Sequence, residues 1–201
     1  MFHYLRKYGM YVIRFFKNYK WCYVIIDDRL PAQKKGYEGM KLVFARCRAA
    51  NELWVPIIEK AYAKIHNCYE ALISGYIDDG LADMTGLVSE KVKLQKEFKK
   101  KGVKYVKFPH PNLNRSKDEL WSWLREKIEQ NTMMGCSINS SPKVPGEKAE
   151  HEFYYKGDKS GLMAGHAYSI IDIIDITDVA GKPQRILRLR NPWGKLLIHY
   201  H

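Results

Sequence analysis

The sequence has few cysteines and lacks long apolar runs, and these shortages exclude several classes of protein. Its four cysteines stand far apart and form no C-x-x-C pair, which argues against a disulfide framework or a zinc site and favours reduced thiols. No apolar run approaches the roughly 20 residues of a membrane-spanning helix. The first sixteen residues also lack the apolar stretch of a signal peptide. We therefore expect a cytoplasmic protein without a membrane span.

Acidic side chains are fewer than basic ones. The chain has 22 Asp and Glu residues and 34 Lys and Arg residues, which gives a net charge of +12. Much of the excess lies in residues 91–107. This segment is either a solvated basic face or a docking surface for an acidic partner: tubulin tails, anionic lipid or nucleic acid. Nothing in it resembles a nucleic-acid-reading motif, so we expect no nucleic acid as the partner.

Hydrophobic residues make up 46% of the 201 positions, enough for one large core or two small lobes. Residues 11–16 and 21–26 are predicted to be strands joined by a short turn. The second strand is continuously apolar, so we expect it to be buried on both faces. An apolar stripe indicates a helix that begins near Pro56. Residues 74–86 are rich in Gly and Asp and are interpreted as a loop.

In the second half of the chain, Gly and Pro in residues 101–111 mark a candidate boundary between two lobes. The S-K-D-E run at residues 116–119 is typical of a capping box that opens a helix. Residues 135–138 are predicted to form a short strand, and residues 140–161 a mobile loop. The strand contains Cys136, whose apolar neighbours should raise its pKa rather than activate it.

The stretch from residue 161 to residue 194 is predicted to form a β-hairpin with a functional group at each side of its open end. Residues 167–174 are rich in β-branched side chains. Residues 186–191 alternate, with Leu187, Leu189 and Asn191 on one face and Arg188 and Arg190 on the other. Turn residues lie between the two segments. A symmetric antiparallel register then sets His166 directly opposite Asn191, with Cβ atoms roughly 5 Å apart.

At that distance the asparagine amide can hydrogen-bond one imidazole nitrogen and fix its tautomer, so that the other nitrogen can accept a proton. A single histidine at a strand end is more often structural, and an Asn-Pro dipeptide is usually a turn. Their juxtaposition is more telling, because Cys–His–Asn is one variant of the catalytic triad. The pair alone lacks a nucleophile.

The motifs G-H-A-Y-S and R-N-P-W-G resemble the His and Asn blocks of calpains, the calcium-dependent papain-like cysteine proteases of peptidase family C2. Further motifs follow in the family's order: W-C-Y-V-I-I-D-D-R-L-P (21–31), K-L-V-F (41–44), N-E-L-W (51–54), E-K-A-Y-A-K (59–64), Y-E-A-L (69–72), D-M-T-G (83–86) and G-C-S-I (135–138). The resemblance implies a partial α+β papain-like core. Residues 1–108 would be the end of the first, helix-containing lobe, and residues 109–201 the start of the second, antiparallel β lobe.

The resemblance also implies roles for individual residues. His166 would be the general base, Asn191 its orienting partner, and Trp193 a shield that keeps solvent off their hydrogen bond. Glu52 matches a calcium ligand of the family, although its partner ligands are not found in this sequence. The family's counterpart of Cys136 is structural.

The calpain nucleophile lies in a Gln-Gly-x-x-x-Asp-Cys-Trp block ahead of the first strand pair, and this sequence contains no such block. Two functions therefore stay open. The chain is a fragment of a cysteine endopeptidase that acts on polypeptides and is inactive alone. Alternatively, it is a non-proteolytic calpain-fold protein, a pseudoenzyme that binds an acidic partner such as tubulin in a cytoskeletal or ciliary assembly.

Overall fold

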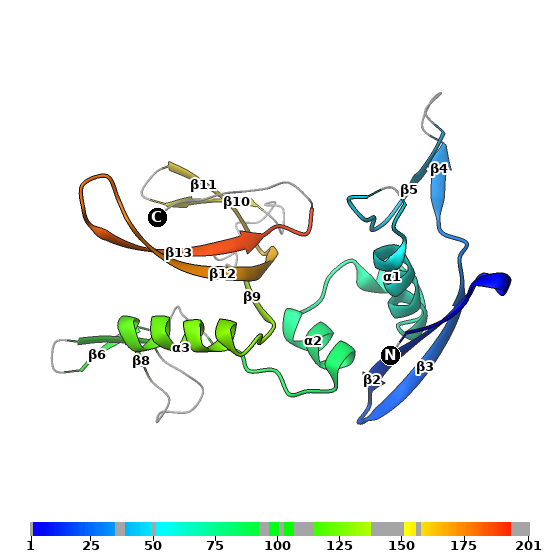
Figure 1. The fold of residues 1–201 in the computed structure, drawn as a ribbon, viewed down its shortest axis with the longest axis horizontal. Coiled ribbons are helices and arrows are strands. Elements are labelled where there is room, and N and C mark those ends of the chain that lie inside the picture. Colours follow the sequence, from blue (N-terminus) through cyan, green and yellow to red (C-terminus); the bar gives the residue numbers. More distant parts are fainter. Residues whose placement is uncertain are drawn as a thin grey trace, which may run out of the picture. The chain divides into compact units, whose positions relative to one another are not determined.

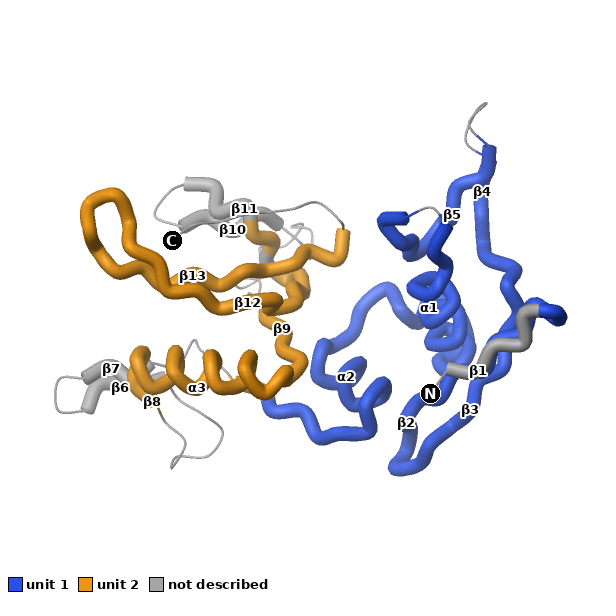
Figure 2. The backbone as a smooth tube through the Cα atoms, in the orientation of Figure 1, with its two compact units in different colours: residues 1–90 blue, residues 91–201 orange. Residues whose placement is uncertain are grey.

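The computed structural model describes residues 2–34, 39–49, 51–92, 97–100, 103–106, 115–137, 151–155 and 158–193. The chain divides into two compact units, residues 1–90 and residues 91–201, which Figure 2 colours separately. Helices and antiparallel sheets both occur, in agreement with the predicted α+β class (Figure 1). The predicted lobe boundary at residues 108 and 109 lies outside the described residues and stays a prediction. No helix of the described ranges has the length and apolar character needed to cross a membrane.

The first unit combines a three-stranded antiparallel sheet, a two-stranded ribbon and two α-helices. Its elements are β1 (Phe2–Leu5), a short 3₁₀ turn (Arg6–Tyr8), β2 (Met10–Lys17), β3 (Lys20–Asp27), β4 (Ala32–Lys34), β5 (Met40–Leu42), α1 (Trp54–Ile65), a second 3₁₀ turn (Glu70–Leu72) and α2 (Ile77–Thr85). The turn between β2 and β3 places Asn18 and Tyr19 at φ angles of 52° and 62°. A tight hairpin that follows the twist of its strands needs these positive angles. Both predicted strands are confirmed.

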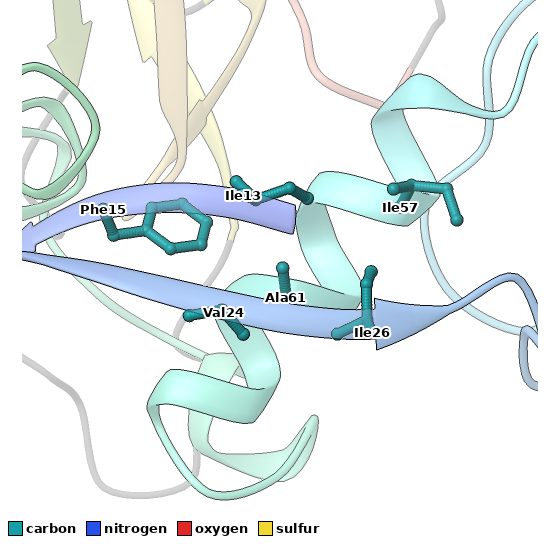
Figure 3. Packing of buried hydrophobic residues seen from close by; sticks show 6 residues of the cluster. All are labelled: Ile13, Phe15, Val24, Ile26, Ile57 and Ala61. Atoms are coloured by element: carbon teal, nitrogen blue, oxygen red, sulfur yellow. The ribbon is translucent and has the colours of Figure 1, made fainter. Parts of the chain in front are cut away.

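The core of this unit lies between α1 and one face of the sheet. Figure 3 shows the cluster, which comprises Ile13 and Phe15 of β2, Val24 and Ile26 of β3, and Ile57 and Ala61 of α1. Full burial of a side chain such as Ile57 or Phe15 stabilises the fold by about 1.5–3 kcal/mol. The expectation that β3 is buried on both faces is wrong, because Tyr23 and Ile25 are 63% and 52% exposed. Alternate residues of β3 point away from α1, which covers only one face.

The predicted loop at residues 74–86 is also wrong, because it contains α2. Asp83 of α2 is only 8% exposed. Its Oδ2 accepts hydrogen bonds from Lys17 Nζ at 2.5 Å and from the Tyr62 hydroxyl at 2.7 Å. The carboxylate therefore links α2 to β2 and α1. These long-range contacts stabilise a helix for which the local sequence has only a weak preference.

Gly86 ends α2 in the left-handed region, with φ of 72°, and its N–H donates to Ala82 O at 2.8 Å. A Cβ atom at this position would lie 2.9 Å from the Trp21 ring. Backbone conformation and space thus both require glycine here, which explains the last residue of D-M-T-G.

In its described residues, the second unit has one α-helix and three antiparallel sheets, in the orders β13-β12-β9, β6-β7-β8 and β10-β11. Its elements are β6 (Glu97–Lys100), β7 (Val103–Val106), β8 (Arg115–Ser116), α3 (Lys117–Glu129), β9 (Met134–Ser137), β10 (His151–Tyr155), β11 (Asp158–Ala164), β12 (Ala167–Thr177) and β13 (Pro183–Arg190). The capping box is confirmed, since Ser116 Oγ accepts from Glu119 N–H and Glu119 Oε2 accepts from Ser116 N–H. The predicted loop at 140–161 is wrong where it overlaps β10 and β11, and residues 140–150 lie outside the described ranges.

Polar contacts join α3 to the β12–β13 hairpin. Trp121 Nε1 donates to Asp175 Oδ1 at 2.9 Å, and Arg125 forms an ion pair with the same carboxylate. Arg185 of β13 pairs with Asp118 of α3 at 2.6 Å. These contacts fix the helix against the hairpin whose open end holds the candidate site.

Candidate active site

His166 and Asn191 lie just beyond the ends of β12 and β13, at the open end of the hairpin. The side chain of each is buried, with 6% and 5% of the residue exposed. Asn191 is followed by Pro192, which has no N–H for the sheet ladder and restricts the backbone of the residue before it. The strand therefore ends here, and Asn191 lies at the open end of the hairpin with its carboxamide within hydrogen-bond distance of the imidazole.

The two side chains are in hydrogen-bond contact, with His166 Nε2 and Asn191 Oδ1 3.0 Å apart. The Trp193 backbone N–H donates to the same Oδ1 at 2.9 Å. Because a backbone N–H can only donate, this contact identifies the atom as the carboxamide oxygen. An oxygen acceptor requires that Nε2 carries the proton, so the lone pair of the neutral ring is on Nδ1.

The register that brings them together differs from the predicted one. β12 pairs with β13 as Ser169 with Arg190, and a bulge between Ile170 and Asp172 shifts the ladder by one residue. Continued past its last pair, this register sets His166 opposite Trp193 rather than opposite Asn191. The prediction of a directly opposed pair is wrong because the hairpin turns about residue 180, where Thr177 pairs with Pro183, rather than between residues 178 and 179. The bulge moves the register back by only one residue, and the imidazole reaches the carboxamide diagonally.

Trp193 also contacts the ring itself. The centroids of the Trp193 and His166 rings lie 4.2 Å apart with an interplanar angle of 41°. The indole is 52% exposed while the imidazole beneath it is buried. Trp193 therefore covers the histidine with its side chain and holds Asn191 with its backbone.

Tyr168 is a part of the site that the sequence reasoning missed. Its ring meets that of His166 edge-on, with centroids 5.0 Å apart and an angle of 89°. Its hydroxyl accepts a hydrogen bond from Met163 N–H at 2.8 Å. Tyr168 is two residues from His166 in the G-H-A-Y-S motif, on a strand that alternates, and this spacing was the available signal.

Cys136 lies in β9, a strand of the sheet that carries the site. It pairs with Tyr168 in the register of β9 and β12. Burial raises the pKa of its thiol to about 11. A thiol with this pKa is protonated at neutral pH and is a poor nucleophile. The structure thus agrees with the expectation that apolar surroundings keep this residue unreactive.

Glu52 precedes α1 and is exposed. Its Oε2 accepts a hydrogen bond from Trp54 Nε1 at 3.3 Å. Among the described residues, no group of three or more His, Cys, Asp or Glu side chains could hold a metal ion. Calcium takes six to eight oxygens, so the described residues around Glu52 do not fit a calcium site.

Comparison with known proteins adds independent information. The family model for calpain family cysteine proteases matches residues 1–199. The chain is 31% identical to the Calpain-2 catalytic subunit of Mus musculus, over 94% of the chain and 22% of that protein. It is 35% identical to Calpain-A of Drosophila melanogaster, over 92% of the chain and 19% of that protein. The chain is 33% identical to the Calpain-type cysteine protease DEK1 of Zea mays, over 92% of the chain and 7% of that protein. The chain thus spans about a fifth or less of these relatives.

Proposed function

Because the chain belongs to the calpain family of cysteine proteases, we propose that it supplies the histidine–asparagine half of a cysteine endopeptidase site. The observation that carries the proposal is the shared Asn191 Oδ1, which accepts from both His166 Nε2 and the Trp193 N–H. Two donors on one oxygen hold the carboxamide in a single orientation. The carboxamide in turn selects the tautomer that a general base needs.

In this proposal the nucleophilic thiol comes from outside the described residues. His166 Nδ1 accepts the thiol proton, and the resulting thiolate attacks the carbonyl carbon of a peptide bond. The imidazolium then returns its proton to the leaving amine, which leaves an acyl-enzyme for water to hydrolyse. Asn191 positions the ring throughout, and Trp193 keeps water from competing for their hydrogen bond.

The test joins a segment with the family's Gln-Gly-x-x-x-Asp-Cys-Trp block to Met1 and measures casein hydrolysis. We expect His166→Ala to reduce the rate by at least about 10³-fold, as removal of a triad member does. Asn191→Ala should reduce it on the order of 10²-fold through lost orientation. A folded fusion that neither cleaves casein nor reacts with a thiol-directed epoxide would contradict the proposal.

A second function, that of a non-proteolytic calpain-fold protein, is favoured by Cys136, whose raised pKa leaves the site's own sheet without a reactive thiol. In this alternative the chain binds an acidic partner in the cytoplasm, in a cytoskeletal or ciliary assembly. The basic segment proposed for this contact lies mostly outside the described side chains. The 201-residue chain should then leave casein intact with or without calcium, and so should the fusion protein.

In this proposal, Glu52 is the one calcium ligand that the chain contributes, and the described residues do not supply the others. No catalytic step is assigned to the ion. Isothermal titration of the chain with calcium should give the same heat for the natural sequence and for Glu52→Gln. A calcium site in this chain that Glu52→Gln abolishes would mean that the missing ligands lie outside the described residues.

A further inference from the structure

The face of the β1–β2–β3 sheet that points away from α1 carries aromatic and apolar side chains. The register of β2 and β3 sets Val12 opposite Ile25, Arg14 opposite Tyr23, and Phe16 opposite Trp21. These pairs alternate with the core pairs, so all six side chains lie on the outer face. Of these, Trp21, Tyr23 and Ile25 are 38%, 63% and 52% exposed. We refer to Arg14, Trp21, Tyr23 and Ile25 as the outer-face cluster.

Among the described residues, Arg14 of this cluster has no counter-ion. Its guanidinium carbon lies 4.0 Å from the centroid of the Trp21 ring, and its Nε atom is buried without a hydrogen-bond partner from those residues. In the part of the chain that the structure describes, no carboxylate forms an ion pair with Arg14. A guanidinium held over an aromatic ring is restricted in position, and its planar fork of donors suits a bidentate carboxylate.

A shallow groove of about 360 Å³ continues the cluster at the edge of the sheet, lined by Tyr23, Val24, Ile25, Lys64 and Ile65. β3 is the edge strand, and Lys64 Nζ donates to its Ile25 carbonyl at 2.7 Å. The lysine blocks the strand edge against addition of another strand. It also adds a second cation beside the apolar side chains.

We propose that the outer-face cluster binds an acidic segment of a partner protein, with a carboxylate on Arg14 and an apolar side chain between Tyr23 and Ile25. Trp, Tyr and Arg are the residues that contribute most to binding at protein interfaces. The unit that carries the cluster also has an excess of basic residues, with 13 Lys and Arg against 10 Asp and Glu in residues 1–90, which favours an acidic occupant. A second copy of the chain would bring its own Arg14 against the first. Nucleic acid would need more cations along its phosphates than Arg14 and Lys64 supply. The proposal does not depend on proteolysis at His166.

The experiment measures fluorescence anisotropy of a labelled peptide of alternating Glu, Leu and Tyr, titrated with the whole 201-residue chain. We expect Tyr23→Glu to weaken binding by about ten-fold or more, because it removes apolar contact and places a carboxylate beside Arg14. Tyr19→Glu is the matched control, since Tyr19 is 97% exposed in the turn of the same hairpin. Both variants lower the net charge by one, so equal weakening by both would mean non-specific attraction and would overturn the proposal.

Two further variants and an NMR map of the binding surface distinguish a loss of peptide binding from a loss of folding. Tyr23→Thr suits a strand and should weaken binding several-fold, and Arg14→Gln should reduce the preference for Glu over Gln in the peptide. Amide shifts on peptide addition should fall on β2 and β3 in two-dimensional NMR spectra. Shifts confined to other elements would overturn the proposal. So would displacement of the peptide by oligothymidylate, or self-association that Tyr23→Glu abolishes.

Discussion

At the residue scale, the two hydrogen bonds to Asn191 Oδ1 make a direct prediction for His166. The buried Nε2–H should give a resolved, slowly exchanging proton resonance, because its acceptor is fixed 3.0 Å away and the ring is 6% exposed. Asn191→Ala removes the acceptor, so we expect this resonance to broaden into the solvent signal. Asn191→Asp retains an oxygen acceptor and should preserve it. A sharp resonance in the alanine variant would mean that the carboxamide does not hold the ring.

Tyr168 has two separable contacts, and two variants distinguish them. Tyr168→Phe keeps the edge-on ring but removes the hydroxyl, which leaves Met163 N–H without its acceptor. A lost hydrogen bond of about 1 kcal/mol corresponds to roughly five- to ten-fold faster amide exchange at Met163. The His166 resonance should persist in this variant. Tyr168→Leu removes the ring as well and should alter both readouts, whereas loss of the His166 signal in Tyr168→Phe would contradict this division.

At the scale of elements, Asp83 joins α2 to β2 and α1. Burial alone would raise the pKa of this carboxyl, but hydrogen bonds from Lys17 and Tyr62, with the charges of Lys17 and His66, hold it below its ordinary value. His66 Nε2 lies 3.5 Å from Asp83 Oδ2. The ionised carboxylate is therefore favoured in the folded state, and the stabilisation that it gives is present at neutral pH.

Asp83→Asn should lower the free energy of unfolding by about 2 kcal/mol at pH 7, measured by urea denaturation. Because the folded pKa is the lower one, the contribution is complete above the unfolded value near 3.9 and is lost as the pH falls through the folded value. The difference between the two proteins should thus persist at pH 5 and shrink only below about pH 4, as the carboxyl becomes protonated. Asp28→Asn, which alters an exposed carboxylate, is the control and should change stability by less than about 0.5 kcal/mol. A difference that stays undiminished at about pH 2 would contradict the assignment.

The elements also show which features the sequence could predict. Strands β2 and β3 and the capping box of α3 follow from local patterns, because alternation and a serine three residues before a glutamate act over short distances. α2 could not be predicted this way, since its stability comes from the contacts of Asp83 with distant elements. The apolar run of β3 was misleading because an exposed, apolar sheet face gives the same pattern as a buried strand.

The candidate site was predictable in identity but not in geometry. The motifs indicated His166 and Asn191 at the open end of one hairpin, and the two side chains do meet there. The hairpin turns about residue 180 rather than between residues 178 and 179, and the β-bulge near Ile170 offsets only one residue of this difference. No residue type in the strand announces the bulge. The roles of Tyr168 and of the Trp193 backbone depend on ring orientation and on a backbone donor, neither of which a sequence motif encodes.

At the scale of the whole molecule, the four thiols differ in exposure, and burial raises the pKa of Cys136. Cys68 is exposed, and Cys22, Cys47 and Cys136 are partly buried. The proposed function requires that none of them serves as the nucleophile for His166. Their relative reactivity across the intact chain therefore tests the proposal without any added segment.

We expect iodoacetamide at pH 8 to modify Cys68 first and Cys136 last, with the sites followed by peptide mass spectrometry. A thiol with a pKa of about 11 is only about one part in a thousand thiolate at this pH, so Cys136 should react on the order of 100-fold more slowly than an ordinary exposed cysteine. His166→Ala should leave all four rates unchanged, because the imidazole activates none of these thiols. Fast modification of Cys136 that disappears in His166→Ala would instead identify a nucleophile within this chain, and the half-site proposal would then be wrong.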